Sequence, residues 1–166
     1  DAIRWLKERA LHAAFDRFRV NVHSKGSARA ESFERFTREH AGWLEDYALF
    51  RALKDAHARI AWWDWPALLR DRDPASLARA RDEYQSSVLR YQYLQWLAHR
   101  QWAKARAELR AMGVEVMGDL PFMVGGDSAD VWANQGEFRN HESVGVPGDQ
   151  FSEDGQEWGL PPYNWS

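Results

Sequence analysis

Apolar residues follow the helical period through most of the first 113 residues, and this period is lost after Gly113. In the opening stretch DAIRWLKERALHAAFDRFRV they recur three or four residues apart, which predicts an amphipathic helix. Another helix is predicted to start at Pro74, because the Asp73 carboxylate can accept hydrogen bonds from the free N–H groups in the first turn of that helix. Gly113 suits the C-cap that would end this helix. Residues 1–113 are therefore predicted to form a helical subdomain.

The helical region contains breaks. The stretch NVHSKGSARA has loop-forming residues and no apolar period, so a second helix is expected only from about Glu31. Pro66 prevents a continuous helix through WWDWP. A single helix over residues 74–113 would be long for a globular protein, so a kink within it stays open. The apolar stripes expected to pack are Ile3, Leu6, Ala10, Ala13, Ala14 and Phe18 in the first helix and Phe33, Phe36, Trp43, Tyr47, Phe50 and Leu53 in the second.

A short β-branched run follows the helical region. The sequence VEVM at residues 114–117 is typical of the strand that returns after a Gly-capped helix in an α/β unit. Functional groups of α/β barrels collect at the carboxyl ends of strands, which is where Asp119 would lie. A functional carboxylate and a simple cap or turn carboxylate are both open for Asp119. Further on, Asp127 or Ser128 is expected to cap a short helix.

The last part of the chain, GVPGDQFSEDGQEWGLPPYNW, combines aromatic rings with prolines and glycines. No helical or strand period runs through it, so an irregular loop is predicted. Its rings are too numerous for a solvated linker and offer flat apolar surfaces for a ring-shaped ligand. The net charge of −3 argues against nucleic acid but is compatible with a neutral sugar. The ten tryptophans of the chain can also serve packing.

Several kinds of chemistry lack support in the sequence. The chain has no cysteine, which excludes disulfides and thiolate metal sites and fits a reducing cytoplasm. The carboxylates Asp119, Asp127, Asp130 and Asp149 match no calcium-loop spacing, so no metal and no cofactor are expected. No apolar run approaches the ~20 residues of a membrane span, and the start at Asp1 shows no signal peptide. A cytoplasmic protein or an excised piece of one, with no membrane partner, is therefore expected.

Two stretches resemble a known family. GDLPFMVGGDSADVWAN and GVPGDQFSEDGQEWGLPPYNW closely resemble the signatures of the 4-α-glucanotransferases (amylomaltases or disproportionating enzymes) of glycoside hydrolase family 77. WLEDYALFRALKDAH, WWDWP and QWLAHRQW also look like the helical insertion of that family. The resemblance covers nearly all of the chain from about Ser32 onwards. Its matched positions are dense, which makes it far more specific than a single motif.

The resemblance implies an α/β fold, part of a (β/α)₈ TIM barrel of the α-amylase clan with a large helical insertion. This segment would be predominantly α-helical, with residues 1–113 in the insertion and residues 114–166 supplying a barrel strand and a substrate-site loop. The family transfers α-1,4-glucan pieces between glucans by a retaining double displacement, which needs a nucleophilic carboxylate and an acid/base carboxylic acid. Both, and a third stabilising Asp, lie on later strands in the family. No catalytic residue is therefore expected in this chain, a fragment that should be inactive alone.

The resemblance also implies a set of substrate-binding residues. The loop from Gly145 to Trp165 resembles a lid over the donor and acceptor sugars. Aromatic rings can stack on the apolar faces of pyranose rings, and amide or carboxylate groups can bond the hydroxyls. Tyr163 and Trp165 are expected instead to fasten the loop. The predicted substrate-binding residues are Asp119, Asp149, Phe151, Ser152, Gln156 and Trp158.

Other functions stay open from the sequence. One is a non-catalytic helical module that binds carbohydrate or acts as a scaffold, and another is a hydrolase of the same clan. The expected partners are α-1,4-glucans, namely maltooligosaccharides, starch or glycogen, in carbohydrate metabolism. An incomplete barrel would expose strand edges and apolar faces, so self-association of the isolated chain is also expected.

Overall fold

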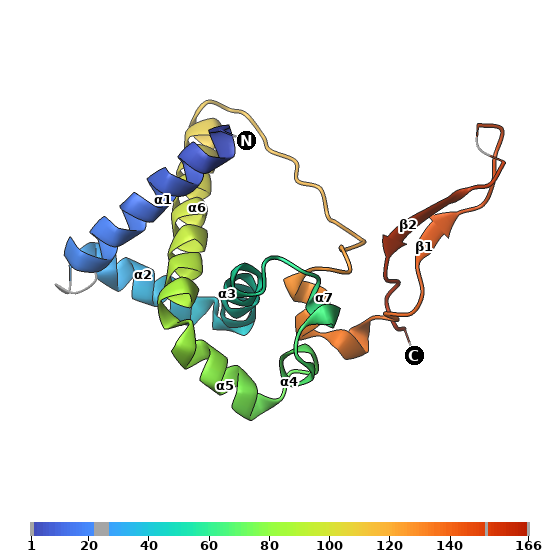
Figure 1. Cartoon of the computed structure of the whole chain (residues 1–166). Helices are drawn as coiled ribbons and strands as arrows, with labels where there is room; N and C mark the ends of the chain where they lie inside the picture. Colours follow the sequence, from blue (N-terminus) through green and yellow to red (C-terminus); the bar gives the residue numbers. More distant parts are fainter. Residues whose placement is uncertain (1, 22–26, 152, 166) are drawn as a thin grey trace. The chain divides into compact units, whose positions relative to one another are not determined.

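The computed structural model describes residues 2–21, 27–151 and 153–165 (Figure 1). The chain divides into two compact units. Unit 1 consists of Asp1–Leu53 and Ala80–Met117, and unit 2 consists of Lys54–Arg79 and Gly118–Ser166. The described residues form seven α-helices and one two-stranded sheet, so the predicted predominance of helix is confirmed. The predicted domain division at residue 113 stays a prediction.

No helix among the described residues combines the length and the apolar character needed to cross a membrane.

Unit 1 is helical and has an aromatic core. It contains α1 (Ala2–Asn21), α2 (Ala28–Glu39), most of α3 (Ala41–Ala56) and α6 (Gln85–Ala111). Both α1 and α2 contact α6. The rings of Phe18 and Phe33 lie 5.3 Å apart at an interplanar angle of 77°, the edge-to-face arrangement that aromatic pairs favour. The buried members of this core are Phe15, Phe18, Phe33, Phe36, Leu44, Tyr93 and Trp96.

Helix α1 forms where the sequence predicts it, but it buries a different set of side chains. Phe15 and Phe18 are buried, whereas Ile3 and Leu6 are exposed. The ring of Tyr93 lies 5.6 Å from Phe15 and 4.7 Å from Phe18, and so covers the second half of the helix. The predicted stripe is wrong at Ile3, Leu6, Ala10 and Ala13, because the described part of unit 1 offers no surface that buries them.

The second predicted helix is two helices, α2 and α3, separated at His40. Helix α2 begins at Ala28, earlier than predicted, because the Ser27 hydroxyl accepts a hydrogen bond from the Ala30 amide at 3.2 Å. Trp43 was expected in the packed stripe but is about half exposed. The stripe is buried as predicted at Phe33, Phe36, Phe50 and Leu53.

The helix predicted from Pro74 starts as expected. Oδ2 of Asp73 accepts the Ser76 amide at 2.8 Å at the start of α5 (Pro74–Glu83). This backbone hydrogen bond lowers the pKa of the Asp73 carboxyl. The helix is interrupted at Tyr84 and continues as α6, so the possible kink is a break between two helices.

Helix α6 ends at Ala111, and Gly113 supplies the predicted cap after it. The Val114 amide donates to the Leu109 carbonyl at 2.9 Å, and the Gly113 amide donates to the Arg110 carbonyl at 3.1 Å. Gly113 has a positive φ of 74°. These features make a Schellman cap, which favours glycine because no Cβ atom opposes the left-handed conformation.

The strand predicted at residues 114–117 is absent. The segment has no regular structure, and Met117 is 97% exposed. A parallel strand is stable only when neighbouring strands bond its backbone and other elements cover its faces. The sheet of the described residues contains only β1 and β2, so nothing there pairs with residues 114–117. Asp119 follows in the same irregular segment and is exposed, so it does not lie at the end of a strand.

Unit 2 packs short helices around tryptophan side chains. Trp132 is fully buried, its ring meets Trp65 edge-on at 5.7 Å, and its indole N–H donates to the Leu69 carbonyl at 3.1 Å. Ser128, one of the two predicted caps, accepts the Val131 amide at 3.3 Å. The elements of unit 2 are η2 (Trp62–Asp64), α4 (Ala67–Arg70), α7 (Ala129–Ala133), η3 (Gln135–Glu137), β1 (Val144–Val146) and β2 (Gln156–Leu160), together with the beginning of α5.

The stretch predicted as an irregular loop contains a β-hairpin (Figure 1). Strands β1 and β2 pair antiparallel with Gly145 opposite Glu157 and a bulge between Val144 and Gly145. A Cβ atom at Gly145 would lie 2.2 Å from the Gln156 carbonyl oxygen, so only glycine fits this pairing. The loop prediction is wrong because most residues of both strands are exposed. A strand without a buried face needs no apolar alternation.

The chain after the hairpin is tied back to η3. The rings of Tyr163 and Phe138 lie 4.9 Å apart, and the Asn164 amide donates to the Glu137 carbonyl at 2.8 Å. Trp165 is exposed, and its ring lies 5.6 Å from Tyr163. Tyr163 therefore has the packing role expected of it.

Candidate functional site

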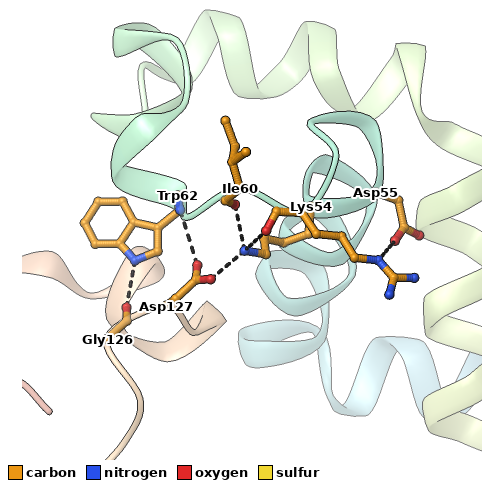
Figure 2. A network of polar contacts seen from close by, with 7 residues as sticks. Lys54, Asp55, Ile60, Trp62, Gly126 and Asp127 are labelled. Carbon is orange, nitrogen blue, oxygen red and sulfur yellow. Dashed lines mark hydrogen bonds and ion pairs between the residues drawn. The ribbon is translucent and has the colours of Figure 1, made fainter. Parts of the chain in front are cut away.

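A polar network links two segments of unit 2 (Figure 2). Lys54, in the last turn of α3, has only 14% of its side chain exposed and forms an ion pair with Asp127 at 2.5 Å. The other carboxylate oxygen of Asp127 accepts the Trp62 amide at 3.2 Å. The Trp62 indole N–H donates to the Gly126 carbonyl at 2.8 Å. The network therefore holds residues 126–127 against the turn that follows α3.

The same lysine stabilises a strained turn. Ala58 and Arg59 adopt positive φ angles of 52° and 63°, which cost free energy for residues that carry a Cβ atom. The Lys54 ammonium donates to the carbonyl oxygens of Arg59 at 3.0 Å and Ile60 at 2.7 Å. These hydrogen bonds offset the strain and hold the turn that leads to η2.

An open cavity of about 690 Å³, here named the unit 2 cavity, is bordered by part of this network. Its volume falls in the ~300–1,000 Å³ range of small-molecule sites. A Cβ atom at Gly126 would lie 3.7 Å from the Trp63 ring and 3.6 Å from the Pro161 ring, so backbone and two apolar rings meet there. The cavity is lined by Trp62, Trp63, Arg70, Asp71, Gly126, Gln135, Asn140, His141, Glu142, Ser143, Glu157, Gly159 and Pro161.

Hydrogen bonds within the lining determine which atoms of the Gln135 and Asn140 side-chain amides can bond a ligand. The Gln135 amide nitrogen donates to the carbonyl oxygens of Arg70 at 2.7 Å and Trp132 at 3.3 Å. The Asn140 amide nitrogen donates to the Gln135 main-chain carbonyl at 3.4 Å. Because both hydrogens of the Gln135 amide are used, its side-chain oxygen is the group that can bond a ligand.

The charges in the lining partly neutralise one another. Arg70 binds Asp71 in a bidentate pair, through Nε at 2.7 Å and Nη2 at 2.9 Å. This hydrogen bonding raises the pKa of Arg70 and lowers the pKa of Asp71. Glu142 lies 3.5 Å from the guanidinium of Arg139. With three carboxylates and one guanidinium in its lining, the cavity does not suit an anionic ligand.

Four of the predicted substrate-binding residues lie on or beside the hairpin. The Trp158 indole N–H donates to the Gln156 side-chain oxygen at 3.1 Å, which brings these two residues of β2 together. Asp149 accepts the Phe151 amide at 2.8 Å in a local turn. The ring of Phe151 is 87% exposed, and that of Trp158 is partly exposed. The hairpin therefore presents aromatic and polar groups to solvent.

The other two predicted residues differ. Ser152 lies outside the described residues. Asp119 is exposed, and no hydrogen bond or ion pair joins it to the hairpin in the part of the chain that the structure describes. None of the predicted residues within the described ranges lines the unit 2 cavity.

A family model described as 4-alpha-glucanotransferase matches residues 1–166, the whole of the sequence. The chain belongs to the 4-alpha-glucanotransferase family. A 4-alpha-glucanotransferase of Thermus thermophilus is 41% identical over 162 residues, which cover 94% of this chain and 32% of the relative. The chloroplastic/amyloplastic 4-alpha-glucanotransferase of Solanum tuberosum is 39% identical over 143 residues, which cover 81% of this chain and 25% of the relative.

A solved structure gives the same family. The amylomaltase from Streptococcus agalactiae in complex with acarbose matches with a TM-score of 0.84 and 29% identity. The match covers 95% of this chain and 32% of the amylomaltase. This 4-alpha-glucanotransferase family member therefore spans about 32% of the length of the Thermus relative and of the solved amylomaltase.

The residues of the unit 2 cavity were not predicted as site residues of this 4-alpha-glucanotransferase family member. The signal for one side was WWDWP, in which the adjacent Trp62 and Trp63 precede Pro66. The other side comes from residues 135–143 and 157–161, which only folding brings to the tryptophans. No group of three or more His, Asp or Glu side chains among the described residues could hold a metal ion.

Proposed function

We propose that the chain is a segment of a 4-α-glucanotransferase that moves α-1,4-glucan pieces between glucans by a retaining double displacement. The observation that carries this proposal is the family match over residues 1–166. The similarity to an amylomaltase solved with acarbose supports a sugar-binding role. The partners in this proposal are α-1,4-glucans, and neither nucleic acid nor a membrane takes part.

The proposed enzyme is a (β/α)₈ barrel, and residues 114–117 become one of its strands. The exposed side chains of Val114, Val116 and Met117 support this assignment, because the interior and the outer helices of a barrel would cover the two faces of such a strand. Residues 1–113 supply the helical insertion, and residues 114–166 supply the strand and the hairpin. The nucleophile, the acid/base and the stabilising carboxylate lie outside this chain, so it is inactive alone, and its self-association stays a prediction.

The hairpin binds sugar in this proposal. Trp158 and Phe151 stack on pyranose faces, and Gln156 and Asp149 bond hydroxyls. The exposure of both rings supports these roles, because neither side chain belongs to the core of unit 2. Asp119 and Ser152 complete the proposed set of substrate-binding residues.

The proposed location is the cytoplasm, in the metabolism of glycogen, starch or maltodextrins. The absence of cysteine supports a reducing compartment. The words chloroplastic/amyloplastic in the name of the potato relative make the plastid the competing location.

Incubation of the complete enzyme with maltotriose tests the proposed activity. Glucose and oligosaccharides longer than maltotriose are expected, because transfer conserves the number of glycosidic bonds. Glucose and maltose alone would identify a hydrolase, and unchanged maltotriose would favour a non-catalytic carbohydrate-binding module. The 166-residue chain is the matched control and should leave maltotriose unchanged.

A further inference from the structure

We infer that the unit 2 cavity binds a short stretch of α-1,4-glucan through residues other than those proposed for the hairpin. This inference rests on the proposed function, which supplies the glucan as ligand. Four features of the cavity support the inference: an exposed aromatic ring, hydrogen-bonding groups, a negative charge and walls held by hydrogen bonds.

Trp63 provides the apolar surface of this site. It lines the cavity and is 47% exposed, whereas its neighbour Trp62 is buried. The two rings meet edge-on at a centroid distance of 5.6 Å, and the hydrogen bond to Gly126 holds Trp62 in place. The half-exposed indole is therefore backed by a fixed side chain. A pyranose ring can lay its apolar face on such a surface and keep its equatorial hydroxyls at the rim.

The polar groups of the lining suit those hydroxyls. The Gln135 side-chain oxygen can accept a hydrogen bond, because the amide hydrogens are already used. Glu157 adds an exposed carboxylate from β2, which can accept two or more hydroxyl hydrogens. Arg70 keeps N–H groups beyond the two that it gives to Asp71, so it can donate to a sugar oxygen. A sugar needs both kinds of group, because each of its hydroxyls can donate one hydrogen bond and accept others.

The charge of the lining excludes the main competing class of small ligand. Asp71 is paired with Arg70 and Glu142 with Arg139, so the exposed Glu157 carboxylate leaves the lining with a net negative charge. A phosphate or a phosphorylated sugar would be repelled, whereas a neutral glucan pays no such electrostatic cost.

The walls of the cavity are preorganised. Two of its lining residues, Trp62 and Gly126, are joined by a hydrogen bond. The ion pair between Lys54 and Asp127 holds the backbone next to this bond (Figure 2). A ligand therefore does not have to order these segments when it binds, which reduces the entropy cost of association.

The test follows binding of maltoheptaose to the 166-residue chain in a Trp158→Ala background, which removes the main ring proposed for the hairpin. Indole N–H signals are recorded by NMR, with Trp63→Phe to assign the Trp63 signal, and affinity is measured by calorimetry. We expect saturable movement of the Trp63 signal and at least a ten-fold loss of affinity in Trp63→Ala. Glu157→Gln, on an exposed strand position, should weaken binding two- to five-fold.

Trp43→Ala is the matched control, because Trp43 is also 47% exposed but belongs to unit 1 and does not line this cavity. It should bind maltoheptaose as the background chain does. A Trp63 signal that stays still at millimolar maltoheptaose would overturn the inference, as would equal affinities of the Trp63→Ala and Trp43→Ala chains. In the complete enzyme, Trp63→Ala must also bind maltoheptaose more weakly than Trp43→Ala does. Equal affinities of these two variants there would also overturn the inference.

The two hypotheses fail separately. Disproportionation of maltotriose by the complete enzyme without a Trp63 response would leave the proposed function standing and overturn the cavity site. A Trp63 response without disproportionation would support the cavity site and remove the transferase function.

Discussion

At the scale of residues, the hairpin depends on glycines at positions where the backbone leaves no room for a Cβ atom or adopts a left-handed conformation. A Cβ atom at Gly155 would lie 2.5 Å from the Val146 carbonyl oxygen, and Gly155 has a φ of 70°. Gly159 has a φ of 66°, and the Ser143 hydroxyl accepts its amide at 2.8 Å beside the bulge. These positions serve a close approach or a left-handed backbone, both of which disfavour any other residue.

Gly145→Ala should disrupt the hairpin. The added Cβ atom would lie 2.2 Å from a backbone oxygen of Gln156, which cannot move without breaking the pairing of β1 and β2. Overpacking of this kind costs ~1–3 kcal/mol. Amide hydrogen exchange should lose protection in both strands. Gly136→Ala is the control, because a Cβ atom there meets nothing within 4 Å; equal protection in the two variants would contradict the prediction.

Lys54→Met should lower the melting temperature of the chain. It removes the ion pair to Asp127 and the donors to two carbonyl oxygens in a mostly buried position, a loss of ~1–3 kcal/mol for groups left without partners. Lys104→Met is the control, since its 3.7 Å pair with Glu108 is exposed and such pairs contribute ~0–1 kcal/mol. Thermal unfolding, followed by circular dichroism, measures both variants. Equal melting temperatures of the two variants would contradict the prediction.

At the scale of elements, helix ends follow from chemistry within a few residues. Ser27 and Asp73 each accept an amide three residues later, and α2 and α5 begin beside them. Gly113 accepts the left-handed conformation that ends α6. The turn after α3 is different, because Ala58 and Arg59 adopt positive φ without being glycine and rely on Lys54 from the preceding helix.

Asp73→Asn should remove a pH-dependent part of the stability of α5. The Ser76 amide lowers the pKa of Asp73 in the folded chain, so the charged carboxylate stabilises the fold above the unfolded pKa of ~3.9. This contribution is lost as the pH falls through the lowered folded pKa. Asparagine still caps but carries no charge. Melting temperatures should therefore differ between the two chains at neutral pH and converge as the pH falls through the lowered folded pKa, and a difference that is constant with pH would refute the assignment.

At the scale of the whole molecule, each unit has its own aromatic core, built from segments that are far apart in the sequence. In unit 1, Phe18 packs on Trp96, and in unit 2, Trp65 packs on Trp132. Exposed apolar side chains concentrate instead at Met117, in the irregular segment that links the units along the chain, and at neighbouring positions: Met112, Val114, Val116, Leu120 and Phe122. This segment needs further partners before its apolar surface is buried.

In the complete enzyme, Trp158→Ala should reduce glucan transfer more than it reduces stability. Trp158 is partly exposed on β2, so its removal leaves the core of unit 2 intact. Aromatic contacts are worth ~0.5–1.5 kcal/mol beyond buried area, so kcat/KM should fall at least about ten-fold when water exclusion is also lost. Hydrolysis should rise relative to transfer. Trp62→Ala, at a buried ring, should instead lower Tm first.

Early melting of the Trp158→Ala enzyme with an unchanged ratio of transfer to hydrolysis would show that this ring only holds the hairpin in place. Maltotriose kinetics and thermal unfolding, measured on the same preparations, separate the two roles.

The sequence by itself determined the family, the helical majority and the helix ends at Asp73 and Gly113, because caps and period depend on neighbours along the chain. Tertiary structure decided which face of α1 is buried, since Phe15 needed Tyr93 from α6. It also decided the hairpin, which depends on Gly145 meeting β2. Tertiary structure also decided the unit 2 cavity, because its walls come from segments that are far apart in the sequence and that no local sequence pattern brings together.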